Sequence, residues 1–267
     1  MDNRPVGIFD SGLGGLTAVR EFKKLLPHEN IIYFGDTGRM PYGVRPAGEI
    51  RIIAAQNIDF VASQGAKAMI AACGTISSTA DDLLLQSPTP VCGVLKPGVA
   101  ELCAGGQDVV GVIATATSIR SGAYERQIAA LCPGKSVVAV SCPKFVTLIE
   151  SGRYDKNDGD VQAAMTEYLT PMKTAGVGAL LLGCTHYGLI GEAISDFFDG
   201  RVQLIGAADA AARETARYLA ENGLEGSSEG EDKFYTSGSV EEFERLGRLF
   251  LGRDITGMVE YLPPFPL

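Results

Sequence analysis

The hydrophobic pattern of the first third of the chain consists of short apolar runs separated by longer amphipathic stretches. Three such runs are residues 5–10, 30–35 and 68–73. Buried strands of a parallel sheet have this nearly continuous apolar character. Between the runs, residues 16–26 and 49–64 carry apolar side chains at helical spacing, and Pro27 ends the first of these stretches. The alternation predicts a β-α-β-α-β series, which is typical of a parallel sheet with right-handed crossovers.

The same pattern recurs in the middle of the chain. Its strands are predicted at residues 109–115, 136–141 and 179–184, and its helices at 124–131 and 161–175. Gly7 and Cys73 are 66 positions apart, and Gly111 and Cys184 are 73 apart, so the corresponding positions of the two series have similar spacing, within a few residues. This correspondence predicts an internal duplication.

The duplication predicts an α/β protein of two pseudo-symmetric domains, with mainly parallel sheets flanked by helices. The tail adds a helix at 207–222, a polar loop at 226–232, a strand at 233–236 and a helix at 240–251. We expect this tail to pack back on the first half. The expected domains are residues 1–97 together with 208–267, and residues 98–207. Ligand sites commonly form where two such sheets face each other, so we expect the active site in the interdomain cleft.

Composition and charge narrow the class of protein. The 267 residues are 46% hydrophobic and 21% charged, which is ordinary for a globular chain. A formal net charge of −9 argues against nucleic acid or an anionic membrane as a partner. The sequence has no apolar run near the roughly 18–20 residues that span a bilayer. The amino-terminal residues lack the apolar region of a signal peptide, so we expect a cytoplasmic protein.

Six cysteines stand at positions 73, 92, 103, 132, 142 and 184, and none of them forms a Cys-x-x-Cys pair. This spacing favours free thiols over a disulfide framework and supplies no set of ligands for a metal. We interpret four of the cysteines as small buried side chains: Cys92, Cys103, Cys132 and Cys142.

The other two cysteines, Cys73 and Cys184, occur in matched contexts. Each ends a predicted strand, and a threonine follows within two residues, as Thr75 and Thr185. His186, one of only two histidines, comes two residues after Cys184. A nearby imidazole or a helix amino terminus lowers the pKa of a thiol and raises its reactivity. Two thiols at the carboxyl edges of matched sheets are therefore candidates for a common site.

Two thiols without a cofactor fit a racemisation best. A nucleophilic hydrolase needs one thiol and leaves the second unexplained, and a disulfide oxidoreductase favours close sequence spacing. Racemisation needs one base on one face of a carbon and one acid on the other, and a thiol can serve as either near neutral pH. The hydroxyls and backbone amides after each strand can hold carboxylates. Asp10, at the end of the first strand, is placed to hold or polarise a catalytic group.

Two alternatives from other classes stay open at this point. The loop from Asp10 to Gly15 partly matches a dinucleotide fingerprint, with Asp36 at the end of the next strand, but Thr17 replaces the third glycine. A dinucleotide- or anion-binding module is therefore one alternative. The other is a single-thiol hydrolase, for which replacing Cys73 and replacing Cys184 would have very unequal effects.

Several motifs along nearly the whole chain resemble those of the glutamate racemases, within the cofactor-independent aspartate/glutamate racemase superfamily. They are residues 7–16 (GIFDSGLGGL), 36–43 (DTGRMPYG), 72–75 (ACGT), 142–146 (CPKFV) followed by Glu150, 183–187 (GCTHY), 234–238 (FYTSG) and 250–253 (FLGR). The chain departs from the family pattern at two positions. Gly74 stands where asparagine is usual, and Ser118 stands where threonine is usual.

The resemblance implies a two-base interconversion of L- and D-glutamate that supplies D-glutamate for peptidoglycan. By that resemblance Cys73 takes the α-proton from the D-enantiomer and Cys184 takes it from the L-enantiomer. Asp10 would assist Cys73, and His186 and Glu150 would assist Cys184. The implied substrate-binding residues are Asp10, Ser11, Pro41, Tyr42, Gly43, Gly74, Thr75, Thr115, Ser118, Thr185 and His186. The resemblance implies no cofactor or metal, glutamate as the small-molecule partner, and a homodimer; a racemase of aspartate or another amino acid is the runner-up within the class.

Overall fold

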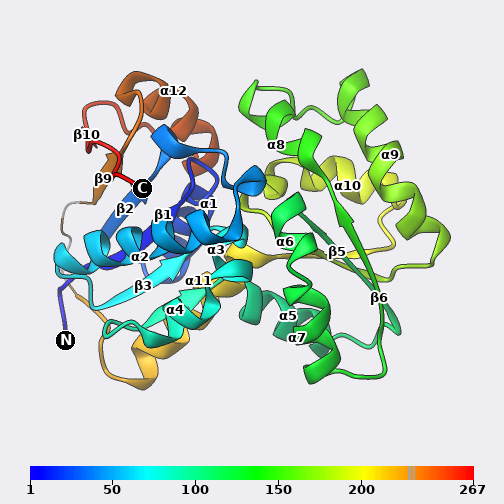
Figure 1. Cartoon of the computed structure of the whole chain (residues 1–267), viewed down its shortest axis with the longest axis horizontal. Coiled ribbons are helices and arrows are strands. Elements are labelled where there is room, and N and C mark those ends of the chain that lie inside the picture. Colours follow the sequence, from blue (N-terminus) through cyan, green and yellow to red (C-terminus); the bar gives the residue numbers. More distant parts are fainter. Residues whose placement is uncertain (228–229, 231) are drawn as a thin grey trace.

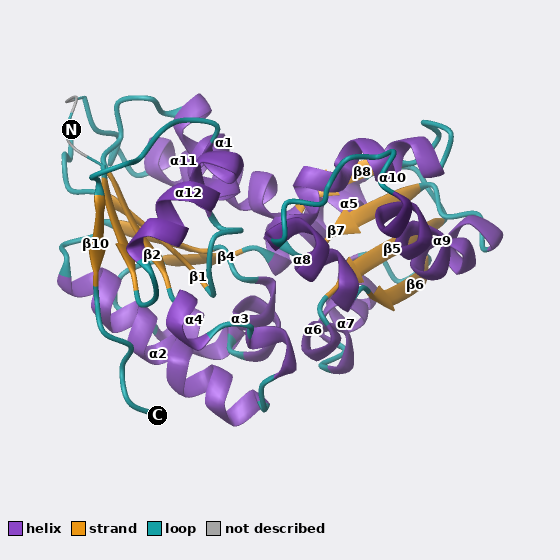
Figure 2. Cartoon of the chain, turned by 90° about the horizontal axis from the view of Figure 1, so that it is seen from above, coloured by secondary structure: helices purple, strands orange, loops and turns teal. Residues whose placement is uncertain are grey.

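A computed structural model describes residues 1–227, 230 and 232–267 of the chain. It contains two parallel sheets, each covered by helices on both faces, in two lobes that lie side by side (Figures 1 and 2). We call the six-stranded sheet with its helices the first lobe and the four-stranded sheet with its helices the second lobe. Of the predicted polar loop at 226–232, the residues Ser228, Glu229 and Glu231 lie outside the described residues.

The first sheet has the strand order β10-β9-β2-β1-β3-β4, and every neighbouring pair is parallel. Its strands are β1 (Val6–Asp10), β2 (Ile31–Gly35), β3 (Ala68–Ala71), β4 (Val91–Gly93), β9 (Lys233–Thr236) and β10 (Val259–Tyr261). The tail of the chain thus joins the first lobe, as predicted. Strands β1, β2 and β3 are buried at every position, which explains their unbroken apolar character.

The second sheet repeats this topology on a smaller scale. Its order is β6-β5-β7-β8, again entirely parallel, and it corresponds strand for strand to β2-β1-β3-β4. Its strands are β5 (Val109–Ala114), β6 (Ser136–Ser141), β7 (Ala179–Leu182) and β8 (Gln203–Gly206). The shared order supports the internal duplication that the sequence predicts. Strand β3 and strand β7 occupy equivalent places in the two sheets.

Helices and short 3-10 turns connect these strands. The helices are α1 (Leu16–Leu25), α2 (Ala47–Ser63), α3 (Gly74–Thr79), α4 (Asp81–Gln86), α5 (Leu95–Ala104), α6 (Ala116–Arg120), α7 (Ala123–Leu131), α8 (Pro143–Glu150), α9 (Gly159–Thr174), α10 (Gly191–Phe197), α11 (Ala207–Glu221) and α12 (Val240–Leu251). The turns are η1 (Thr37–Arg39), η2 (Tyr42–Val44) and η3 (Thr185–Ile190). In the described part of the chain, none of the helices is both long and apolar enough to cross a membrane.

The chain crosses between the lobes twice, and helices pack along both crossings. The first crossing lies between β4 and β5 and contains α5; the second lies between β8 and β9 and contains α11. Helix α11 packs against both α5 and α1, and one hydrophobic core cluster contains residues of both lobes. The predicted domain boundaries fall within these two crossings and stay predictions.

One expectation about the cysteines is wrong. Cys103 and Cys132 form a disulfide, with their Cα atoms 6.0 Å apart, whereas the sequence favoured six free thiols. Cys103 lies in α5, Cys132 directly follows α7, and these two helices pack together. The pair is 29 residues apart in sequence, so only the packing of the helices brings the two thiols together. Cys73, Cys92, Cys142 and Cys184 are free.

Candidate active site

Cys73 and Cys184 stand at equivalent places, each just beyond the carboxyl end of a buried strand. Cys73 follows β3 and begins α3, while Cys184 follows β7 and begins η3. Their strands pair with β1 and β5, respectively, at the centre of each sheet. The side chains are largely buried, with exposed fractions of 4% for Cys73 and 9% for Cys184. Both cysteines line one cavity between the lobes.

This cavity has a volume of about 210 Å³, below the roughly 300–1,000 Å³ of pockets for drug-sized ligands, and therefore suits a small molecule. Every predicted site residue except Ser118 lines it. The lining consists of Asp10, Ser11, Met40, Pro41, Tyr42, Gly43, Val44, Cys73, Gly74, Thr75, Thr115, Ala116, Pro143, Val146, Thr147, Glu150, Cys184, Thr185 and His186. These residues come from both lobes, in agreement with a site in the interdomain cleft.

Cys184 belongs to a chain of three interacting side chains. Its Sγ is 3.7 Å from Nδ1 of His186, and Nε2 of His186 is 3.0 Å from Oε1 of Glu150. Burial opposes the charged form of His186, but the contacts with Cys184 and Glu150 outweigh burial and raise its pKa to about 10. The imidazole of His186 therefore lies between the sulfur of Cys184 and the carboxylate of Glu150.

Cys73 has a different environment. Burial, together with the nearby charge of Asp10, raises the pKa of the Cys73 thiol to about 12. Asp10 is itself held in place, because the backbone N–H of Gly15 donates to its Oδ2 at 2.8 Å. The loop around it is closed by Tyr33, whose hydroxyl donates to the carbonyl oxygen of Gly12 at 2.6 Å. At neutral pH the thiol of Cys73 is therefore neutral.

The loop that carries Pro41, Tyr42 and Gly43 is anchored beneath the cavity by Asp36. The hydroxyl of Tyr42 donates to Oδ2 of Asp36, and Ser237 donates to Oδ1 at 2.6 Å. Arg39 completes the arrangement as an ion pair with Asp36, Nε to Oδ2 at 2.6 Å. Asp36 is fully buried. Asp36 therefore holds the loop in place. Both of its carboxylate oxygens are already bonded, so neither is available to bind the ribose of a dinucleotide.

Hydroxyl groups from the two lobes meet at one side of the cavity. Thr75 of α3 and Thr115, which caps α6, are 3.0 Å apart between their Oγ1 atoms. Ser118 is fully buried behind them and does not line the cavity. Its Oγ accepts a hydrogen bond from Ser78 at 3.1 Å and is 2.9 Å from Oγ1 of Thr115. Ser118 therefore contacts Thr115, which lines the cavity, but does not line the cavity itself.

Helix α8 contributes more of the lining than the sequence analysis predicted. Only Glu150 was named there, but Pro143, Val146 and Thr147 also face the cavity. The four positions are spaced i, i+3, i+4 and i+7, so they form one face of the helix. That spacing is the signal from which the additional residues could have been found. Met40, Val44 and Ala116 adjoin predicted residues and were also missed.

The charge of the lining is unusual for a site that would hold an anion. Asp10, Glu150 and His186 are its titratable groups besides the cysteines and Tyr42, and no lysine or arginine is among the lining residues that the structure describes. An anion would therefore be held by backbone N–H groups and hydroxyls, which can bind carboxylates without a cationic partner.

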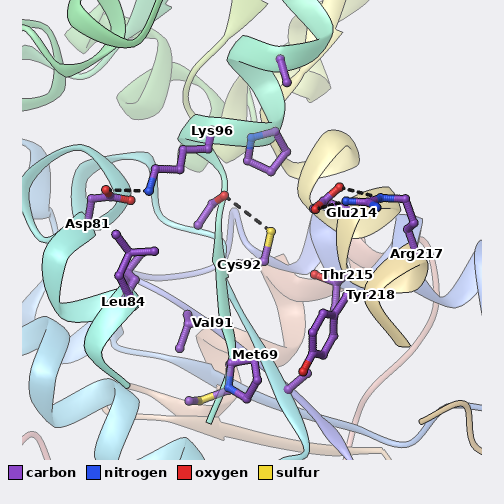
Figure 3. Close-up of a pocket in the computed structure, with 16 residues that line it drawn as sticks. Met69, Asp81, Leu84, Val91, Cys92, Lys96, Glu214, Thr215, Arg217 and Tyr218 are labelled. Atoms are coloured by element: carbon purple, nitrogen blue, oxygen red, sulfur yellow. Dashed lines mark hydrogen bonds and ion pairs between the residues drawn. The ribbon is translucent and has the colours of Figure 1, made fainter. Parts of the chain in front are cut away.

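A second cavity, of about 470 Å³, is larger but lies elsewhere, between β4, α4, α5 and α11 (Figure 3). Its charged residues are already paired: Lys96 with Asp81 at 2.9 Å and Arg217 with Glu214 at 2.6 Å. Burial raises the pKa of its single thiol, Cys92, to about 11, so this thiol is neutral near pH 7. In the described residues this lining has no imidazole and no second thiol. The larger cavity therefore lacks the pair of thiols and the imidazole that line the smaller one.

Comparisons with known proteins agree with the fold and identify the family. The model of the family described as Asp/Glu/Hydantoin racemase matches residues 17–215. A glutamate racemase of Latilactobacillus sakei subsp. sakei is 38% identical over 260 residues, covering 96% of this chain and 94% of the relative. The crystal structure of a glutamate racemase from Francisella tularensis in complex with D-glutamate is similar with a TM-score of 0.92 and 37% identity, covering 99% of each chain. The glutamate racemase isoform RacE1 from Bacillus anthracis gives a TM-score of 0.93 at 30% identity over 100% of both chains.

Proposed function

The chain belongs to the Asp/Glu/Hydantoin racemase family, and on that basis we propose that it interconverts L- and D-glutamate by a two-base mechanism without a cofactor. One observation carries the proposal: two thiols at equivalent strand ends of a duplicated fold line a single small cavity. A nucleophilic hydrolase would leave one of these thiols without a role.

In the L-to-D direction, the thiolate of Cys184 removes the α-proton of L-glutamate. The thiol of Cys73 then donates its own proton to the opposite face of the same carbon, which gives D-glutamate. The imidazolium of His186 stabilises the starting thiolate, and Glu150 holds the imidazolium in place. The reaction ends with a thiol at Cys184 and a thiolate at Cys73, so protons balance.

The D-to-L direction starts from this second state. The thiolate of Cys73 removes the α-proton of D-glutamate, and the thiol of Cys184 donates a proton to the other face. Burial, together with the nearby carboxylate of Asp10, raises the pKa of the Cys73 thiol, so its thiolate is unfavourable at neutral pH. The raised pKa also makes the Cys73 thiolate a strong base once it has formed, and a strong base suits removal of a weakly acidic α-proton.

Neutral groups around the cavity would hold the substrate. We assign its two carboxylates to the hydroxyls of Ser11, Thr75, Thr115 and Thr185 and to the backbone N–H groups that follow each strand. As the family resemblance implies, the D-glutamate formed would supply peptidoglycan synthesis. Pro41, Tyr42 and Gly43 close the cavity from the anchored loop.

The direct test is incubation of L-glutamate with the protein in heavy water, following chirality and α-deuterium together. We expect D-glutamate that carries α-deuterium, because the donating thiol exchanges its proton with solvent. Aspartate is run in parallel to identify the amino acid that the site accepts. Absence of both inversion and exchange for every amino acid tested would contradict the proposal.

Single cysteine variants separate the two bases. We expect Cys73→Ala to abolish inversion but to retain deuterium exchange into L-glutamate, because Cys184 still reaches the L-face proton. Cys184→Ala should show the opposite preference and exchange only D-glutamate. Cys92→Ala, a free cysteine that lines the other cavity, is the matched control and should invert glutamate normally. If both variants exchange the same enantiomer, the assignment of faces is wrong; if one variant still inverts, the two-base mechanism is wrong.

A further inference from the structure

Two segments from opposite lobes form the mouth of the active-site cavity. Among the lining residues that the structure describes, the exposed ones are Pro41, Val44, Pro143 and Thr147. The first two belong to residues 40–44 of the first lobe, which we call the 40–44 loop, and the other two belong to α8 of the second lobe. Behind the mouth, the two cavity thiols are almost inaccessible, with exposed fractions of 4% and 9%. The position of the 40–44 loop therefore affects whether a small molecule can reach the thiols.

A single side chain of the second lobe holds this loop. The hydroxyl of Thr117 donates to the carbonyl oxygen of Gly43 at 2.7 Å. Thr117 lies in α6, which packs against η2 on the side of the second lobe that faces the first lobe (Figure 1). Within the part of the chain that the structure describes, no other hydrogen bond joins the 40–44 loop to the second lobe. Asp36 thus fixes the base of the loop, and Thr117 fixes the loop at the mouth.

Arg120 sets the direction of the hydrogen bond between Thr117 and Gly43. Its Nη2 lies 3.0 Å from Oγ1 of Thr117. A guanidinium group can only donate, so the Thr117 oxygen accepts from Arg120 and keeps its own proton for the carbonyl of Gly43. A hydrogen bond received from a cation also makes the hydroxyl a stronger donor. The three groups therefore form a relay from the guanidinium of Arg120 through the hydroxyl of Thr117 to the carbonyl of Gly43.

Arg120 has no competing partner among the described residues. It is exposed at the end of α6, makes no ion pair there, and has its one side-chain hydrogen bond with Thr117. Neither Arg120 nor Thr117 lines the cavity. Any influence of these two residues on the reaction must therefore pass through the 40–44 loop or act through charge at a distance, and these two routes can be separated by experiment.

We propose that Thr117 and Arg120 are positioning residues that hold the 40–44 loop against the second lobe and so keep the cavity closed around its substrate. Loss of one such hydrogen bond lowers the ratio of closed to open loop about tenfold. A loop that is closed half of the time would then be closed about one tenth of the time, and the apparent affinity for a ligand of the closed state falls about fivefold. The kinetic form of this inference rests on the proposed racemisation of glutamate.

The first test removes the Thr117 hydroxyl at nearly constant shape. For Thr117→Val we expect KM for L-glutamate to rise about fivefold with kcat within about twofold of the wild type, because saturating substrate restores the closed loop. Thr117→Ser keeps the hydroxyl and should restore the wild-type KM. Thr166→Val is the matched control, because the exposed Thr166 hydroxyl bonds to a carbonyl of its own helix, α9. A general loss of folded protein would lower kcat and leave KM unchanged, and that result would contradict the proposal.

The second test asks whether Arg120 acts through Thr117. We expect Arg120→Met to raise KM about twofold, because Thr117 can still donate to Gly43, and to have no further effect in a Thr117→Val background. Arg126→Met is the control, since Arg126 is exposed and donates to the backbone of Ser121 within the second lobe. If Arg120 instead attracts the anionic substrate, its effect will persist in the double variant and shrink with added salt, which would overturn the relay. Because Arg120 is exposed, its single variant and the salt dependence provide the test if Thr117→Val does not fold.

A third readout does not depend on glutamate turnover. Iodoacetamide should modify Cys73 and Cys184 several-fold faster in Thr117→Val than in Thr166→Val, because the loop opens more often; mass spectrometry of the two peptides measures the rates. Equal rates in the two variants would overturn the inference. Faster modification of Thr117→Val, in a protein whose wild type neither inverts glutamate nor exchanges its α-proton, would support the closing role of Thr117 and overturn the proposed function instead.

Discussion

At the scale of single residues, the two thiols differ although their places in the fold match. Cys184 faces the imidazole of His186, whereas Cys73 faces the carboxylate of Asp10. The first neighbour is cationic near neutral pH and the second is anionic, so the two sulfur atoms have electrostatically unlike surroundings. The proposed racemisation needs two unequally protonated thiols, because two thiolates could not return a proton and two thiols could not remove one.

The pH dependence of turnover should reflect the deprotonation of the His186 imidazolium. Its pKa is raised to about 10, so the imidazolium is present below that pH and is lost as the pH rises through it. We therefore expect kcat/KM to fall above about pH 10. Because the enantiomers have equal free energies in water, the profiles measured from L- and D-glutamate must coincide. A decline that begins near the ordinary imidazole pKa of about 6.5 would contradict the role of the imidazolium.

The sequence indicated the two residues that we propose as bases better than it indicated their surroundings. Cys73 and Cys184 could be singled out because each ends an apolar run, and strand ends meet at one edge of a sheet. The disulfide between Cys103 and Cys132 could not be predicted, since it depends on how α5 packs against α7. The buried place of Ser118 depends in the same way on contact between the lobes.

At the scale of elements, helix α12 shows how local sequence signals and the site are connected. Its buried residues Phe243, Leu246 and Phe250 follow the helical period, and its predicted bounds agree with the structure. The ring of Phe250 packs edge-on against the ring of His186, with centroids 5.4 Å apart. This helix of the first lobe therefore supports the orientation of an imidazole in the second lobe.

Helix α12 begins with a side-chain cap that can be tested. The hydroxyl of Ser239 accepts a hydrogen bond from the backbone N–H of Glu242 at 3.1 Å. We expect Ser239→Ala to lower the free energy of unfolding by about 1 kcal/mol, measured by urea denaturation. Ser63→Ala, near the end of α2, removes an exposed hydroxyl that bonds to a helix carbonyl and should change it by less than about 0.5 kcal/mol. Equal effects of the two substitutions would show that the cap contributes nothing specific.

The elements that the sequence did not reveal include three strands and several helices, among them α5 with ten residues. Strands β4, β8 and β10 have three or four residues and are partly exposed, so they lack the continuous buried apolar run that marks β3 and β7. Helices α3 and α6, with six and five residues, are equally short and are held by contacts between the lobes. Longer elements such as α1 and α9 were predicted to within two residues at each end.

At the scale of the whole molecule, the duplication creates the site. Each sheet supplies one thiol at its carboxyl edge, and neither lobe alone surrounds the cavity. Helices α5 and α11 pack together where the chain crosses between the lobes, so the cavity lies between two lobes that share part of their hydrophobic core. A ligand that touches both lobes should therefore stabilise the molecule as a unit.

Thermal unfolding measures this coupling. At a glutamate concentration 100-fold above Kd, binding should add about 2.7 kcal/mol to the free energy of unfolding. For a chain of this size the midpoint should rise by roughly 5 °C. L-lysine at the same concentration is the control, since it has no side-chain carboxylate for the hydroxyls and backbone N–H groups of the lining to hold. A similar rise with lysine, or none with glutamate, would contradict a glutamate site in the cleft.

The lack of lysine and arginine in the described lining of the cavity has a consequence for inhibitor chemistry. Where an enzyme holds a carboxylate with arginine, a drug must usually keep a negative charge and then crosses membranes poorly. In the proposed mode of binding the anchoring groups are hydroxyls and backbone amides, which also bind uncharged hydrogen-bonding isosteres of a carboxylate. Compounds that replace one carboxylate of the substrate by a primary amide or a sulfone should thus keep much of their affinity while gaining permeability.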